Sequence, residues 1–329
     1  MVSGTDVYQL AMKGSQLEAK DATELEAKLK DSPKDIDTRT KLLGYYFTGQ
    51  YTNKNSAKSR QQHVLWLIKN APESEVLNTP YGGLDHIRSP KAFEKAKELW
   101  LEHLELKPKN LTILANTSSF FGRSDPGKSI ELLERAQEIA PKDPAWPDKL
   151  GQQYSWKMIG LSGAKKREAA SKSLKHFERA YELSDKEGRD AILTSLGKVA
   201  FAAQEMEKAK KYANQMLESD GPTEDWNYGN KVHAGNNLLG RIALANGDVE
   251  EAKKRLLAAA DTLGSPQLDS FGPNMQLASE LLDAGEKQAV LDCFDRCEKF
   301  WDMGADRLKA WRKKVEKGRK PDFGANLRY

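Results

Sequence analysis

The chain has 329 residues, of which 39% are hydrophobic and 30% are charged, and its net charge is +4. No stretch approaches the ~20 consecutive apolar residues that a membrane-spanning helix needs, so membrane insertion is not expected and a soluble protein is predicted. The basic excess is local, because residues 301–329 hold nine Lys and Arg against four Asp and Glu. A compact globule of this length would have two domains, whereas a repeat array grows by adding units, so length alone does not decide the architecture.

The N-terminal segment, residues 1–20, is assigned no helix, and poor order is one expectation for it. Its start, MVSGTDVYQLAMKGS, lacks the basic region and apolar core of a secretion signal. A cytoplasmic location is therefore expected, and a periplasmic or secreted one is the alternative if a signal peptide was removed. Residues 21–36 follow as a single amphipathic helix that we interpret as an N-terminal cap.

A pair of one large and one small residue recurs along the rest of the chain. The pairs are Leu43-Gly44, Leu114-Ala115, Leu150-Gly151, Leu196-Gly197, Leu239-Gly240 and Leu277-Ala278. Each pair belongs to an apolar stripe at helical spacing, with the small residue where another helix approaches closely. A second helix follows, and in the last three repeats its apolar triplet lies twelve, sixteen and nineteen residues beyond the small residue. These triplets are Ala209, Ala213 and Met216; Ala252, Leu256 and Ala259; and Val290, Phe294 and Cys297.

Two repeats depart from this spacing. In the second, Asn78 to Pro90 carries two prolines and a Gly-Gly pair where the first helix should run, so it is either a partner-specific loop or a decayed helix. In the fourth, the stretch from Ile159 to Ser173 contains ten extra residues, including Lys165, Lys166 and Arg167. We predict a lengthened helix with a solvated face there, and an exposed basic loop is the alternative.

The helix pairs resemble tetratricopeptide repeats, which have a large-small pair in the first helix, a small residue opening the second, and a closing proline. Prolines 72, 108, 141, 222 and 266 stand near the expected ends of repeats. The resemblance implies an all-α fold: a tetratricopeptide-like α-hairpin solenoid, a right-handed superhelix, with capping helices at both ends. Its seven partly degenerate repeats cover residues 37–72, 73–108, 109–141, 142–186, 187–222, 223–266 and 267–301, followed by a capping helix and tail in 302–329.

The two cysteines, Cys293 and Cys297, are predicted to line the core of the last repeat, because they lie four residues apart on one helix face. Leu308, Trp311 and Val315 share one face of the C-terminal capping helix. The tail PDFGANLRY ends with Phe323, Leu327 and Tyr329, so we expect it to pack on the last helices. A sharper hypothesis places it in the ligand groove as an internal ligand.

The resemblance also implies that first helices line a concave face, where a peptide or helix of a partner protein binds. Counting from each small residue gives the candidate groove residues. They are Lys41, Tyr45, Asp148, Gln152, Trp156, Thr194, Lys198, Phe201, Asn237, Arg241, Met275 and Ser279. Lys198 and Arg241 beside aromatic surface would suit a partner peptide with acidic groups. Some family members grip a C-terminal carboxylate with Lys and Asn on successive first helices; that set is incomplete here, so binding to chaperone C-termini is not predicted.

The predicted function is a non-enzymatic protein-protein interaction module or scaffold, with no cofactor and no metal. One alternative is a nucleic-acid-associated factor, which would use the basic C-terminal helix. Its residues are Arg307, Lys309, Arg312, Lys313, Lys314, Lys317, Arg319 and Lys320. The other alternative is a helical-repeat enzyme such as a glycosidase, disfavoured because acidic residues such as Glu131, Glu134 and Glu138 lie at the spacing of a solvated helix face. Oligomeric state and partner identity are left open.

Overall fold

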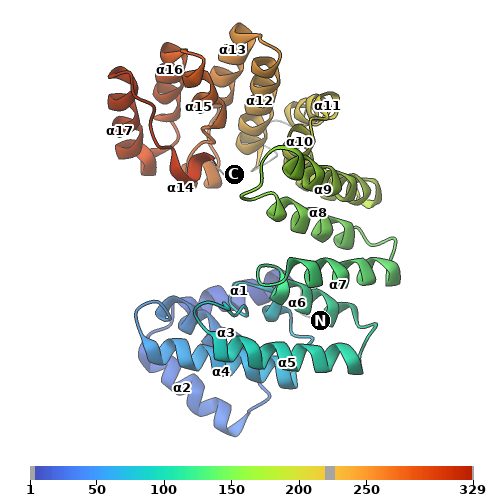
Figure 1. Cartoon of the computed structure of the whole chain (residues 1–329). Coiled ribbons are helices and arrows are strands. Elements are labelled where there is room, and N and C mark those ends of the chain that lie inside the picture. The colour runs from blue at the N-terminus through green and yellow to red at the C-terminus, as the bar shows by residue number, and fades with distance from the viewer. Residues whose placement is uncertain (1–3, 219–226, 328–329) are drawn as a thin grey trace. The chain divides into compact units, whose positions relative to one another are not determined.

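The computed structural model describes residues 4–218 and 227–327, and all regular structure in these ranges is helical (Figure 1). The all-α prediction is therefore confirmed for the described part of the chain. The helices form two compact units, one up to Gln153 and one from Tyr154 onward, and each is described by itself. Within the described ranges, every helix is too short or too polar to cross a lipid bilayer.

The N-terminal unit contains the helices up to the start of α8, in which the boundary lies. They are α1 (Gly4–Ser15), α2 (Ala19–Asp31), α3 (Ile36–Gly49), α4 (Lys54–Asn70), the 3₁₀ turn η1 (Glu75–Asn78), α5 (Pro90–Leu106), α6 (Leu111–Phe121), α7 (Pro126–Ile139) and α8 (Ala145–Lys157). The C-terminal unit holds the rest. They are α9 (Gly163–Leu183), α10 (Lys186–Ala202), α11 (Met206–Leu217), α12 (Tyr228–Ala245), α13 (Val249–Ala260), α14 (Pro266–Phe271), α15 (Gln276–Asp283), α16 (Lys287–Cys297), η2 (Asp302–Gly304), α17 (Ala305–Glu316) and η3 (Gly324–Leu327).

The helix pairs are separated by tight turns with a recognisable chemistry. Between α12 and α13, Gly247 has φ +82°, a conformation that favours glycine, and lets the chain reverse. Asp248 then caps α13, because its side chain accepts a hydrogen bond from the Glu251 N–H at 3.0 Å. Asp125 and Asp185 cap α7 and α10 in the same way. The glycine turn thus ends α12, and the aspartate caps begin helices α7, α10 and α13.

The apolar stripes form the core as the repeat spacing predicted. All nine residues of the three regular triplets are buried, as are Ser173, Phe177 and Ala180 on α9. A methyl group added to Gly197 would lie 2.6 Å from a methyl carbon of Leu238 on α12, and one on Gly240 would lie 2.3 Å from a methyl carbon of Leu277 on α15. Gly197 and Gly240 are thus the points where the first helix of the following repeat packs against the first helix of their own repeat.

At the first repeat, helix α1 is the helix that packs against the small residue, Gly44. A methyl group on Gly44 would lie 1.8 Å from the Ala11 carbonyl oxygen of α1, and one on Gly14 would lie 2.0 Å from the Lys41 carbonyl oxygen. Helix α1 also contacts η1, and Tyr8 packs edge-on against Tyr81. Residues 4–15 are therefore an ordered packing element, where the sequence analysis assigned no helix. Their Leu10-Ala11 pair is the signal that was overlooked.

The second repeat lacks its first helix, as its prolines and glycines indicated. Among residues 71–89, where that first helix would run, only η1 is helical. The segment after η1 is bound by Arg60 of α4. Arg60 occupies the position at which the second helix of a repeat normally has a small residue. The Arg60 Nη2 donates to the carbonyl oxygens of Tyr81 at 2.8 Å and Gly83 at 2.6 Å. The loop is therefore fixed to α4, and α1 supplies the helix that Gly44 would otherwise lack.

Three further predictions agree with the described residues. The insertion lengthens α9 to 21 residues and leaves Lys165, Lys166 and Arg167 exposed, so the lengthened helix is confirmed. Cys293 and Cys297 are buried. Leu308, Trp311 and Val315 of α17 are buried together with Phe323 of the tail. Pro222, where the fifth repeat was expected to end, and Tyr329 lie outside the described residues.

We predict that Gly44→Ala lowers the free energy of unfolding by about 1–3 kcal/mol, because a Cβ there must displace the backbone of α1. Urea unfolding followed by circular dichroism measures this change. Gly127→Ala is the matched control: Gly127 is exposed on α7, its nearest neighbour to a new Cβ is an Asp125 carboxylate oxygen at 3.4 Å, and alanine there should be neutral or slightly stabilising. Equal stability of the Gly44→Ala protein and the wild type would contradict the packing of α1 on α3.

Candidate functional site

Lys198 lies on the first-helix face of α10 and has no ion-pair partner in the part of the chain that the structure describes. Because Gly197 faces the neighbouring helices, the next residue points about 100° away from that contact and is exposed. The surrounding protein still desolvates the ammonium group and lowers the pKa of Lys198. No carboxylate among the described residues is paired with it. Such a group favours binding of an anion, which would restore the interactions that the ammonium lost with water.

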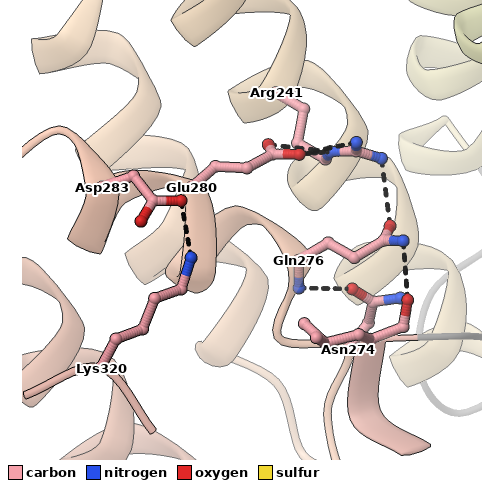
Figure 2. A network of polar contacts seen from close by, with 7 residues as sticks. Arg241, Asn274, Gln276, Glu280, Asp283 and Lys320 are labelled. Atoms are coloured by element: carbon pink, nitrogen blue, oxygen red, sulfur yellow. Dashed lines mark hydrogen bonds and ion pairs between the residues drawn. The ribbon is translucent and has the colours of Figure 1, made fainter. Parts of the chain in front are cut away.

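Phe201 lies one turn after Lys198 on α10, and Arg241 of the neighbouring helix α12 packs on its ring. The Arg241 guanidinium lies over the Phe201 ring, 4.4 Å from its centroid. Figure 2 shows that the same guanidinium grips Glu280 of α15 with two nitrogens, Nε at 2.9 Å and Nη2 at 2.7 Å. Its Nη1 donates to Gln276 at 3.0 Å. The charge of Arg241 is therefore neutralised, and the pair of free cations expected from the sequence is reduced to Lys198.

Asn237 lies one turn before Arg241 and is buried rather than presented to solvent. Its side-chain N–H groups donate to the carbonyl oxygen and to Nε2 of His233, both at 3.0 Å. The Asn237 side-chain oxygen is buried and has no hydrogen-bond partner among the described residues. Asn237 supports α12 from inside, so it does not contact a ligand in the way that its sequence position suggested.

His233 is a buried residue that the sequence analysis passed over. Its Nδ1 donates to the Ala259 carbonyl oxygen at 2.7 Å, and its Nε2 accepts from the Asn274 N–H at 2.8 Å. These two partners fix a neutral ring with the proton on Nδ1. The pKa of His233 is lowered to about 4, mainly by burial, and the nearby charge of Lys198 contributes in the same direction. His233 thereby connects α12 to α13 and to Asn274, two residues before α15.

The C-terminal tail packs on the last helices, as predicted, and covers the start of α15. The Met275 N–H donates to the Asn326 carbonyl oxygen at 2.8 Å, and Gln276 Nε2 donates to the Leu327 carbonyl oxygen at 2.8 Å. Phe323 is buried against the Trp311 ring, with centroids 4.9 Å apart. Lys320 pairs with Asp283 at 2.6 Å (Figure 2). The tail is thus linked to Arg241 through one side chain, because Gln276 donates to Leu327 and accepts from Arg241.

Met275 and Ser279 are consequently not available to a ligand. Met275 is 1% exposed and belongs to the apolar cluster that contains Phe323 of the tail, and Ser279 is 8% exposed. Helical spacing predicted that both residues lie on the ligand-facing side of α15. It did not reveal that the tail packs at the start of this helix. Thr194 is half-buried, and its hydroxyl lies 3.9 Å from the Met216 sulfur.

Four candidate residues belong to the N-terminal unit and are not grouped with Lys198. Lys41 lies where α1 packs on α3, and Tyr45 faces α2 in a small recess with Glu26 and Tyr46. On α8, Gln152 donates to the Asp148 carboxylate at 2.7 Å. Burial raises the pKa of Asp148, and the Gln152 hydrogen bond partly opposes this. Trp156, at the end of α8 in the C-terminal unit, is 54% exposed.

The basic residues of α17 are partly neutralised. Arg312 forms ion pairs with Asp295 and Glu298 of the neighbouring segment, and Lys320 is paired with Asp283. The apolar side of α17 faces the core, so the helix has a structural reason to be amphipathic without any nucleic acid.

No protein-family model matches this chain, and no curated protein matches it.

The burial of His233 predicts a pH-dependent stability. Its pKa of about 4 is below the ordinary value of 6.5, so the unfolded chain binds more protons between these values and stability falls as the pH drops through this window. The stabilisation present above pH 6.5 should decrease by about 2–3 kcal/mol by pH 4.5. Urea unfolding at pH 7 and pH 4.5 measures it. His233→Gln should be less stable at pH 7 and lose less on acidification; equal losses in both proteins would contradict the neutral buried ring.

Proposed function

We propose that the chain is a non-enzymatic protein-interaction module of the tetratricopeptide type, and that the face of α10 and α12 binds an acidic, extended segment of a partner protein. The constant spacing of the buried triplets supports the repeat assignment, because each helix pair buries its stripe on the next. The observation that carries the binding proposal is Lys198, an exposed ammonium group that is desolvated and has no counter-charge among residues 4–218 and 227–327.

The neighbouring side chains define what such a segment should contain. A carboxylate on Lys198 forms a charge-assisted hydrogen bond, which is stronger than a neutral one. The Phe201 ring, with Arg241 packed on it, offers apolar surface for the aliphatic or aromatic part of the same segment. Since Arg241 is already bound to Glu280, specificity for acidic groups rests mainly on one lysine.

We expect Lys198→Gln to weaken binding of acidic peptides about tenfold or more, since hydrogen bonds to charged groups contribute ~1.5–3 kcal/mol. The measurement uses an array of capped hexapeptides that combine Asp or Glu with Leu or Phe, followed by titration of the best binder. Lys210→Gln is the control, because Lys210 is exposed on the second helix α11 and the charge change is identical. Equal binding by both variants, or selection of peptides without acidic residues, would contradict the proposal that Lys198 binds an acidic group of the partner.

The internal-ligand hypothesis for the tail gives a separate prediction. Deleting residues 327–329 removes the carbonyl group that binds Gln276 but keeps Phe323 and Asn326 in place. If the tail competes with ligands, this deletion should raise the affinity for the selected acidic peptide a few-fold, the effect of one or two hydrogen bonds. If the affinity is unchanged in a deletion protein of unchanged thermal stability, the tail does not compete with ligands.

A further inference from the structure

The turn between α8 and α9 exposes two large apolar side chains to solvent. Trp156 is 54% exposed and Ile159 is 80% exposed. The Ile159 N–H donates to the Trp156 carbonyl oxygen at 3.0 Å, a 3₁₀-type hydrogen bond. In such a turn, side chains three residues apart lie on the same side of the chain. Trp156 and Ile159 therefore form one apolar patch, which is called the turn patch below.

The backbone beside the turn patch is surrounded by open space. Gly160 and Gly163 have φ of +80° and +55°, and a methyl group added to either glycine would find no atom within 4 Å. The exposed side chains thus stand on a projecting turn. A helical partner normally inserts its own apolar side chains into a groove. Here the turn itself is the inserting member, so its partner must accept a protruding apolar tip.

Basic residues border the turn patch. Residues 156–168 hold four Lys and Arg against one Glu. Lys165 and Lys166, near the start of α9, are exposed, and no ion pair within the described ranges of the chain involves either of them. Arg167 donates at 2.7 Å to a neutral side-chain amide, which leaves its charge uncancelled. Glu168 is already paired with a lysine one turn further along α9. The border therefore carries a net positive charge.

An apolar tip with cations around it is complementary to the surface of an anionic lipid bilayer. Tryptophan is enriched at the boundary between headgroups and hydrocarbon, because its ring is apolar and its N–H is polar. An aliphatic side chain beside it gains free energy by leaving water. Lys and Arg at the same level are attracted by the negative headgroups. A nucleic acid would bind the cations but leave Ile159 in water.

We propose that the turn between α8 and α9 binds the surface of an anionic lipid bilayer. Trp156 and Ile159 enter the headgroup region, and the cations at the start of α9 contact the anionic headgroups. The contact is interfacial, so it needs no helix that spans the bilayer. It gives a role to the ten extra residues of the fourth repeat, which include Ile159 and the three cations. The proposal is independent of the acidic-segment site, because Lys198, Phe201 and Arg241 are not part of it.

Co-sedimentation of the full chain with vesicles tests the proposal. The chain should sediment with vesicles of phosphatidylcholine and phosphatidylserine in equal parts, and it should stay in solution with phosphatidylcholine alone. Ile159→Ser should weaken binding to the mixed vesicles about tenfold, because burial of one aliphatic side chain is lost. Leu263→Ser is the matched control, since Leu263 is 86% exposed in the same unit and should not contribute.

Removal of charge gives a second readout. The double variant Lys165→Gln, Lys166→Gln should weaken binding to the mixed vesicles about twentyfold, because each cation near an anionic surface contributes about fivefold. The double variant Lys313→Gln, Lys314→Gln removes the same charge from an exposed pair on α17 and should have little effect. Circular dichroism checks that each variant keeps its helicity.

A dye at the tip of the turn separates a bilayer from an acidic protein partner. The Ile159→Cys protein can be labelled selectively, because both native cysteines are buried. The emission of an environment-sensitive dye there should shift to shorter wavelength with the mixed vesicles, but not with soluble polyglutamate. The proposal is overturned if the mixed vesicles do not bind the chain, if either control weakens binding as much as its test variant, or if polyglutamate causes the same shift.

Discussion

The structure depends on one requirement: the buried stripe of each helix pair must be covered by another helix that approaches within methyl-contact distance. Gly197 and Gly240 permit this approach because any larger side chain there would overlap Leu238 or Leu277 of the following repeat. A single pair of helices cannot bury its stripe alone, so stability is shared between neighbours. The same requirement explains why Gly44 has α1 against it, although α1 precedes α3 in the chain and is not part of a regular repeat.

This requirement also determines which surfaces remain for binding. The chain uses its own ends to cover the outermost helices of each unit: α1 lies on α3 in the N-terminal unit, and the tail lies on α15 in the C-terminal unit. Met275 and Ser279 are buried, and Lys41 is half-buried where α1 packs on α3. In the C-terminal unit, Lys198 and Phe201 on α10 and Arg241 on α12 remain candidates, as does the exposed Trp156 at the end of α8.

The spacing of the sequence was sufficient to predict the buried triplets, the lengthened α9 and the apolar side of α17. Each of these follows from helical periodicity within one segment. Helix α1 was missed because a single Leu10-Ala11 pair has no neighbouring repeat to confirm it. The candidate groove was only partly predictable, because periodicity gives the side of a helix and not what lies on it. The pairing of Arg241 with Glu280, 39 residues away, is set by the packing of α12 and α15 and has no local signature.

We propose that partner proteins contact the face of α10 and α12 that carries Lys198, Phe201 and Arg241. Site-specific photo-crosslinking in lysate of the native host tests it most directly, with the crosslinking residue placed at Phe201 and, for comparison, at the exposed Lys210 on α11. Mass spectrometry of the crosslinked peptides identifies the partner segment. The account predicts crosslinks from position 201 to one protein, through a segment rich in Asp and Glu, and none to that protein from position 210. Crosslinks from position 210 alone, or the same products from both positions, would contradict it.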